Sequence, residues 1–286
     1  MAAGSLLLAT LAGVSLGQSA VTASATILFI AGGLPHGAYD IALLRRTVAL
    51  DRSGLTLAIG GYVTIAALMA LLWFTLPLIA LTLFLLVAAA HFGEDWRMLD
   101  ESLLRFAAGA AVIAAPTLGH RMEVTALFAQ MSDERATVIA QIITAAAPVT
   151  LLVTAVGIMI AWRDGSRQWA AAMTLCLILL IIIPPVVGFA LFFVFLHSPR
   201  HIAQTRVVLQ DMSRARWIVT GAMLSGAAIL GWCALRFVAW SPPTENATAQ
   251  AFQLLASVAV PHLVLSRWLE RRLDHTILSS AGTAHS

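Results

Sequence analysis

The sequence contains no lysine, and only 11% of its 286 residues are charged, against about 25% in a typical soluble protein. Retinal-binding pigments hold their chromophore as a Schiff base on a lysine amine, so the absence of lysine excludes an opsin-like function. The 17 basic residues are all arginines, and they stand in short groups between apolar segments, which excludes a nucleic-acid partner bound along a basic stripe. Because 60% of the residues are hydrophobic, the chain is predicted to be all-α: a polytopic transmembrane helical bundle forming a single integral-membrane domain over 1–286.

Cysteine is also scarce, and Cys176 and Cys233 both lie inside apolar stretches without a CxxC spacing. They are predicted to be small buried hydrophobic residues, in neither a disulfide nor a metal site. No basic residue precedes the first apolar stretch, which argues against a cleaved signal peptide. Residues 1–18 are predicted to form either a short extra crossing or an interfacial segment, and 270–286 a polar cytoplasmic tail.

Apolar segments long enough to cross a bilayer predict about nine spans. The run from Leu55 to Ala90 would measure ~54 Å as one helix, too long for a core of ~30 Å, so a turn is expected near 73–77. The same reasoning places a hairpin at Pro184-Pro185. The predicted spans are 19–33, 55–73, 75–90, 104–118, 137–161, 169–183, 186–197, 217–239 and 252–268.

The arginines are distributed unequally between the two sides that alternate loops define. Because basic residues accumulate in cytoplasmic loops, this asymmetry predicts a multi-pass protein of the inner (cytoplasmic) membrane with its C-terminus in the cytoplasm. The other side has Arg121 and Arg135, with Arg236 near its edge; the arginine-rich side has Arg45, Arg46, Arg52, Arg97, Arg105, Arg163, Arg167, Arg200, Arg206, Arg214, Arg216, Arg267, Arg271 and Arg272.

Four of the eight histidines fall at the arginine-rich ends of odd-numbered spans: His36, His91, His197 and His201. Imidazoles that converge at one depth from several helices are typical of a metal site in a bundle, and ionisable residues at membrane depth generally mark function. The alternative is that each ring is an interfacial histidine bonded to backbone or headgroups. His262 lies within the ninth span, where it is either a group beside the metal, a proton-handling residue or a packed core histidine.

Two carboxylates have the spacing needed to orient these rings. Asp40 follows His36 by four residues, and Asp95 follows His91 by four, so on a helix each carboxylate shares a face with its histidine and can accept the second ring N–H. The alternative places both carboxylates in loops that face water. His197 and His201 share the same spacing, either on one continuous helix or with Ser198 and Pro199 beginning a new one.

Ligation by imidazole alone suits zinc, copper, iron or nickel, and does not suit magnesium or calcium. HExxH, GxSxG and P-loop motifs are all absent. A membrane haem protein is one alternative, and a Soret band would reveal it. A transporter is another, although the spans hold few carboxylates and no evident inverted repeat.

Three motifs occur in order along the chain: Gly33-Leu34-Pro35-His36-Gly37-Ala38-Tyr39-Asp40, His91-Phe92-Gly93-Glu94-Asp95 and His197-Ser198-Pro199-Arg200-His201. In these motifs the chain resembles the Brp/Blh family of bacterial and archaeal membrane β-carotene dioxygenases, over about residues 20–270. The resemblance implies an Fe(II) enzyme that uses O2 to cleave the central double bond of β-carotene into two molecules of retinal, a product available to a separate opsin.

The resemblance also implies residue roles. His36, His91, His197 and His201 would hold Fe(II), with Asp40 and Asp95 orienting rings and His262 a further candidate beside them. A pocket between helices could admit the apolar substrate from the bilayer. The aromatic residues expected to contact the polyene are Tyr39, Phe92, Trp96, Phe192, Phe193 and Phe195. A related enzyme acting on a different carotenoid remains an alternative, because nothing in the sequence identifies ring substituents.

Overall fold

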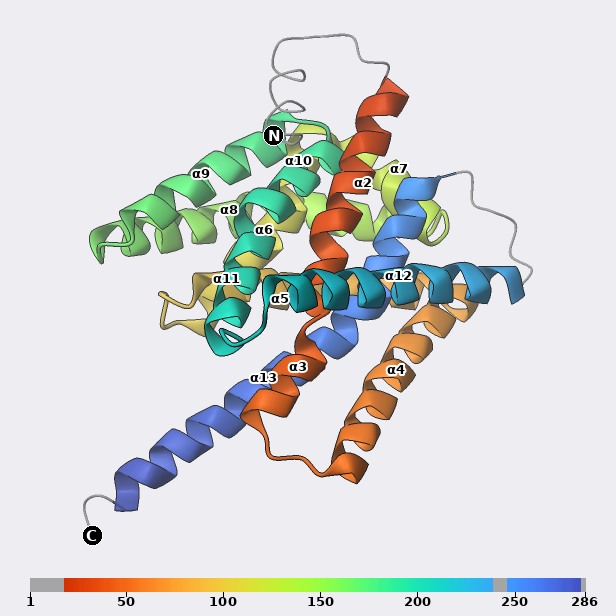
Figure 1. Cartoon of the computed structure of the whole chain (residues 1–286). Helices are drawn as coiled ribbons and strands as arrows, with labels where there is room; N and C mark the ends of the chain where they lie inside the picture. The colour runs from red at the N-terminus through yellow and green to blue at the C-terminus, as the bar shows by residue number, and fades with distance from the viewer. Residues whose placement is uncertain (1–17, 239–245, 284–286) are drawn as a thin grey trace.

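A computed structural model describes residues 18–238 and 246–283 of the chain, apart from the side chains of Gln18, His36 and residues 269–283. The regular secondary structure of the described residues is helical, and short connections join the helices (Figure 1). In chain order they are α2 (Gln18–Gly37), α3 (Asp40–Thr47), α4 (Arg52–Thr75), α5 (Pro77–Gly93), η1 (Glu94–Trp96), α6 (Ser102–Gly119), α7 (Arg121–Met131), α8 (Ala136–Arg163), α9 (Arg167–Ile182), α10 (Pro185–Phe192), η2 (Phe193–His197), α11 (Ser198–Val208), α12 (Arg214–Val238) and α13 (Ala247–Thr283).

Eight helical segments of the described chain are long and apolar enough to cross a membrane, as expected of a multi-pass membrane protein. A helix corresponds to each of the nine predicted spans, but α9, at 16 residues, is shorter than the eight others. The first span continues through α2 and α3, and the seventh runs through α10, η2 and α11 without a break. The segment predicted at 1–18 lies almost entirely outside the described residues.

Proline ends and starts the helices where turns were predicted. A single residue, Leu76, separates α4 from α5, and Pro77 is the first residue of α5. The hairpin at Pro184-Pro185 is likewise confirmed, because α9 ends at Ile182 and α10 begins at Pro185. Proline has no N–H to donate, so it interrupts a helix that runs into it and suits the first turn of the next.

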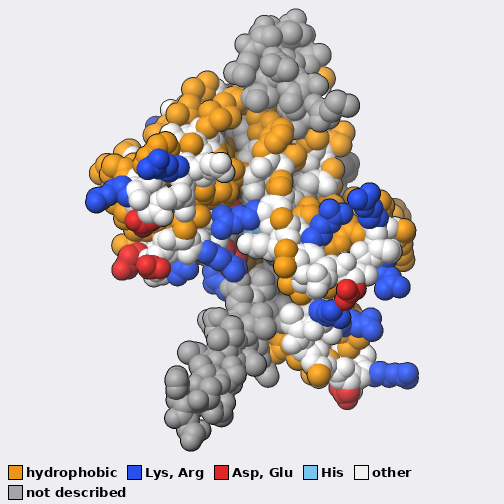
Figure 2. All heavy atoms as spheres, turned by 60° about the vertical axis from the view of Figure 1, so that its left-hand side comes forward, with side chains coloured by type: hydrophobic (Ala, Val, Ile, Leu, Met, Phe, Trp, Pro, Cys, Tyr) orange, Lys and Arg blue, Asp and Glu red, His pale blue; other side chains and the backbone are white. Residues whose placement is uncertain are grey.

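The helices differ strongly in how far they are buried. In the most apolar window of α13, 67% of the residues are buried, whereas the figure is 11% for both α4 and α12. In Figure 1, α13 passes through the middle of the bundle and contacts α2, α4, α5 and α7. Figure 2 shows hydrophobic side chains over much of one face, with most of the charged side chains around its middle and lower part. The outer helices thus present apolar side chains to the surroundings, as is typical of membrane-spanning helices.

A close approach of two backbones fixes the end of α5. A Cβ atom on Gly109 of α6 would lie 1.9 Å from the carbonyl oxygen of Ala89 on α5. Only glycine allows this separation, so α6 and the last turns of α5 are in direct backbone contact. This contact positions His91, which lies two residues beyond Ala89.

Two predictions need correction or extension. Cys176 is buried as predicted, but Cys233 is exposed. It lies on α12, most of whose surface faces outward. The apolar residues around Cys233 in the sequence therefore belong to an outward-facing helix and not to the core. Helix α13 continues to Thr283, so the segment predicted as a polar tail begins as a helical extension of the last span.

Candidate metal centre

His91 lies in the last turn of α5 and is 4% exposed. Its Nδ1 is 3.1 Å from Oε2 of Glu94, three residues ahead. The chain changes at this point from the α-helix into the tighter η1, a 3-10 turn. In a 3-10 turn residues i and i+3 overlie each other, which places Glu94 rather than Asp95 against the His91 ring.

His197 and His201 lie on a continuous helical path that contains a π turn. The π segment η2 ends at His197, and α11 starts directly at Ser198. Pro199 has no N–H, which prevents the regular α-helical bonding from passing through it, and single π turns are frequent at functional sites. The Ser198 hydroxyl donates to the carbonyl oxygen of Gly32 at 2.8 Å rather than capping a new helix. The two imidazole centroids are 4.7 Å apart.

The imidazoles of His91, His197 and His201 form one buried cluster. Each offers a nitrogen within 4.8 Å of the others, and Nε2 of His91 is 3.1 Å from Nε2 of His197. Nδ1 of His197 is 2.8 Å from Oδ2 of Asp95, whose other oxygen is 3.9 Å from Nε2 of His201. The predicted convergence of these three histidines is therefore present in the fold.

The hydrogen-bond partners decide where the protons of two rings lie. A carboxylate only accepts, so His91 donates Nδ1–H to Glu94 and His197 donates Nδ1–H to Asp95. Nε2 of each ring then faces the other at 3.1 Å, a distance at which one nitrogen donates a proton to the other unless a metal ion takes the place of that proton. The donor set and its carboxylate partners fit a metal centre.

His262 adds a fourth ring beside this cluster. Its ring centroid is 5.4 Å from that of His91, and its Nδ1 is 2.8 Å from both carboxylate oxygens of Asp40. Tyr62 of α4 donates its hydroxyl to the same carboxylate at 3.1 Å. His262 is 6% exposed and Asp40 4%, so the pair is buried between α13 and the start of α3.

Both carboxylates predicted to orient a histidine make contacts between segments, and the predicted pair of His91 with Asp95 is not formed. Asp95 bonds to His197 instead of His91, and Asp40 bonds to His262. The reason is that η1 follows His91 and that Asp40 starts the separate helix α3. The prediction that Asp40 orients His36 concerns a side chain outside the described set. The backbone of His36 is in α2, next to Gly37, whose Cβ position is 3.7 Å from the His262 ring.

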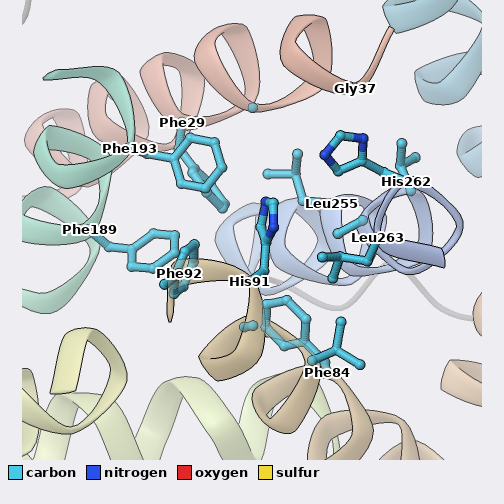
Figure 3. A pocket seen from close by; sticks show the side chains of 15 residues that line it. Phe29, Gly37, Phe84, His91, Phe92, Phe189, Phe193, Leu255, His262 and Leu263 are labelled. Carbon is cyan, nitrogen blue, oxygen red and sulfur yellow. The ribbon is translucent and has the colours of Figure 1, made fainter. Parts of the chain in front are cut away.

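A small apolar cavity of about 40 Å³ adjoins the cluster (Figure 3). His91 and His262 contribute to its wall together with hydrophobic side chains from five helical segments, among them the predicted residues Phe92 and Phe193. Sequence reasoning missed Phe29, Phe84 and Phe189, which also line it. Phe189 lies four residues before Phe193 on the same helical path, a spacing that could have suggested a shared face.

The other four predicted aromatic residues line none of the three cavities that the structure describes. Tyr39 stacks on Trp217 at 3.9 Å and donates its hydroxyl to that residue's carbonyl oxygen. Trp96 is fully buried against Trp169, whereas Phe195 is 56% exposed. Phe192 packs against His197, with centroids 5.9 Å apart. These side chains support the fold around the cluster or face outward.

Two arginines bind the η1 turn, which carries the carboxylates Glu94 and Asp95. Arg200 of α11 donates to the backbone carbonyl of Asp95 and lies over the Trp169 ring at 4.5 Å. Arg267 of α13 lies 3.2 Å from Oε1 of Glu94. The η1 turn is thus connected to α11 and to α13. These contacts hold the two carboxylates in place behind the imidazoles.

The site and fold together define a class: a multi-span helical protein with a buried cluster of three histidines next to an apolar cavity. A family model described as "Beta-carotene 15,15'-dioxygenase" matches residues 27–270, and the chain belongs to this family of oxidoreductases. The resemblance found in the three sequence motifs is thereby confirmed.

Two curated relatives extend this finding. A β-carotene 15,15'-dioxygenase of an uncultured marine bacterium, 66A03, is 29% identical over 87% of this chain and 93% of its own length. A probable β-carotene 15,15'-dioxygenase Blh of Halobacterium salinarum is 28% identical over 92% of this chain and 88% of its own. No solved structure matches the chain. Carotene cleavage is the class of reaction that this relationship supports.

Proposed function

We propose that this chain is a membrane-embedded non-haem iron(II) dioxygenase that cleaves the central double bond of β-carotene with O2 to give two molecules of retinal. The observation that carries the proposal is the cluster of His91, His197 and His201, two of whose rings turn Nε2 inward because carboxylates hold Nδ1. Imidazole ligation suits iron. An apolar cavity next to the cluster suits a polyene.

In this proposal the three clustered histidines hold the metal, and His36 is the fourth ligand that the family resemblance implies. When bound, iron(II) would supply the reaction of the double bond with O2. Glu94 and Asp95 keep His91 and His197 in the tautomer that leaves Nε2 for the metal. Asp40 does the same for His262, which lies at the cavity wall beside the metal.

The phenylalanines have a separate role. Phe29, Phe92, Phe189 and Phe193 are in mutual ring contact, with centroids 5.1 to 6.3 Å apart. They enclose the cavity on the side away from His262 (Figure 3). Packed rings exclude water from the reacting centre and hold a polyene by its faces.

Expression in a β-carotene-accumulating bacterium tests the function directly. Loss of β-carotene with formation of retinal, separated by liquid chromatography against retinal and apocarotenal standards, is the expected result. Unchanged β-carotene with iron-loaded protein in the membrane would reject this substrate and favour a related carotenoid. A Soret band in the purified protein would reject the non-haem site.

The location of the enzyme is part of the proposal. The arginine distribution favours the inner membrane with a cytoplasmic C-terminus. A C-terminal reporter active only in the cytoplasm is expected to be active, and an active periplasmic reporter would reverse the orientation. The retinal product would serve a separate opsin, because this chain has no lysine to bind it.

A further inference from the structure

Three apolar cavities lie in a row through the bundle, with the histidines beside the middle one. The central cavity is the one described above, of about 40 Å³. It shares Phe84, Phe92 and Phe189 with a second cavity of about 60 Å³, here called the aromatic cavity. It shares Gly37 and Val258 with a third and larger cavity of about 360 Å³, open in part to the surroundings and here called the small-residue cavity.

The two outer cavities have no lining residue in common, and they share α13 among the helices that enclose them. The aromatic cavity lies among α5, α6, α7, α10 and α13, and the small-residue cavity among α2, α3, α4, α12 and α13. His91 and His262 line only the central cavity. The histidine cluster therefore has one apolar space on each side, which is the arrangement that cleavage in the middle of a long molecule requires.

The wall of the small-residue cavity is open because its residues are small. Besides larger residues such as Tyr62 and Trp232, α4 and α12 contribute five alanines and one glycine to the lining: Ala66, Ala67, Ala70, Ala227, Ala228 and Gly231. A Cβ atom added at Gly231 would meet no atom within 4 Å. The short side chains of these residues therefore leave space between α4 and α12.

The same cavity faces the exterior of the bundle. Its outer wall consists of α4 and α12, the two least buried spans. These helices meet near their C-terminal ends, where Phe74 stacks on Trp232 at 5.7 Å, and they diverge from there in Figure 1. A hydrocarbon molecule in the bilayer can therefore reach this wall directly.

We propose that the small-residue cavity admits the carotenoid from the bilayer between α4 and α12 and holds one half of it, with the other half directed toward the much smaller aromatic cavity. The lining suits an apolar occupant, because Asp40 and Tyr62 are bonded to each other and Ser257 donates to the Gln253 carbonyl oxygen. Ser225 is the exception, since its buried hydroxyl has no partner among the described residues. Gly37 and Val258 form the passage to the histidines. This inference rests on the proposed function and identifies where one half of its substrate lies.

Gly231→Phe tests the proposal by filling the cavity from α12, and Ala66→Phe fills it from α4. Gly226→Phe is the matched control, since Gly226 is on the same helix, also has no atom within 4 Å of its Cβ position, and lines none of the described cavities. Cleavage of β-carotene is expected to fall about tenfold or more in both cavity variants and less than about twofold in the control.

A substrate shortened on one side, such as an apocarotenal, distinguishes a variant whose small-residue cavity is filled from one whose histidine cluster is damaged. The short end can lie toward the filled cavity, so Gly231→Phe is expected to cleave this substrate at a rate within about threefold of the unmodified enzyme. Equal loss on both substrates, or no loss on either, would overturn the proposal. If the unmodified protein cleaves no carotenoid at all, the proposed function fails instead.

Pigment binding gives a second measurement that needs no turnover. Metal-depleted protein, purified in detergent from β-carotene-containing membranes, is expected to retain carotenoid, and both cavity variants to retain several times less than Gly226→Phe. Equal retention by all variants would overturn the proposal. Phospholipid bound in the cavity of the unmodified protein in place of carotenoid would identify a lipid site and also overturn it.

Discussion

Two histidines of this protein each have a carboxylate three residues ahead, yet their surroundings are opposite. His91 Nδ1 is 3.1 Å from Glu94, and His120 Nδ1 is 3.2 Å from Glu123. The second nitrogen of His120 lies 3.0 Å from the carbonyl oxygen of Ile182, an acceptor. The second nitrogen of His91 faces the Nε2 of His197.

The difference shows that a histidine–carboxylate pair does not by itself make a metal site. Both nitrogens of His120 face oxygen atoms, so the ring connects the end of α6 to the end of α9. The carboxylate at His91 instead directs Nε2 of that ring toward the Nε2 of a second imidazole. The function depends on what the second nitrogen faces, which is set by the packing of α5 against η2 and α11.

Removing a clustered imidazole should have the largest effect. His197→Ala is expected to abolish retinal formation and metal retention while the protein stays in the membrane, because the ring is fully buried at the centre of the cluster. Metal content after purification and pigment chromatography measure the two losses. His120→Ala is the matched control and should keep both properties; full activity in His197→Ala would remove that residue from the site.

The carboxylate behind His197 should have a smaller but clear effect. Asp95→Asn replaces an obligate acceptor with an amide that can also donate, so the ring is no longer held in one tautomer. We expect metal affinity to fall about 10- to 100-fold, measured by competition with a chelator. Glu123→Gln makes the corresponding change at His120 and should leave affinity unaltered. An unchanged affinity in Asp95→Asn would mean that the carboxylate does not orient a ligand.

Glu94→Gln should weaken the metal less than Asp95→Asn does. The Glu94 side chain is 14% exposed and the Asp95 side chain 2%, so water can replace part of the lost acceptor at His91. A fall in affinity of about tenfold or less is expected, in the same chelator assay. A larger loss than in Asp95→Asn would indicate that His91 depends more on its carboxylate than His197 does.

The spans and the convergence of histidines were predictable because both follow from local signals. Hydropathy and proline positions set the helices and their turns, and alternate loops place His91, His197 and His201 on one side. The partners of Asp40 and Asp95 were not predictable from spacing, since a 3-10 turn and a new helix redirect the two carboxylates toward other segments. Such contacts depend on how helices far apart in sequence pack.

The aromatic residues show the same limit. Phe92 and Phe193 line the cavity as predicted, but Phe195, two residues beyond Phe193, is 56% exposed. Residues two apart point to nearly opposite faces of a helix, so Phe193 and Phe195 do not line the same cavity. Proximity to a histidine in sequence was therefore a poor guide to contact with the cavity.

The smallest effect is expected at His120, which lies outside the metal-binding cluster. His120→Ala removes two hydrogen bonds at a partly exposed position, one to Glu123 and one to the carbonyl oxygen of Ile182. The free energy of unfolding should fall by about 1 kcal/mol, with activity of the folded enzyme unchanged. Thermal unfolding in detergent, followed beside a metal assay, separates stability from function. A loss of metal in this variant would mean that the connection between α6 and α9 also sets the position of the cluster, and the distinction between the two histidines would then fail.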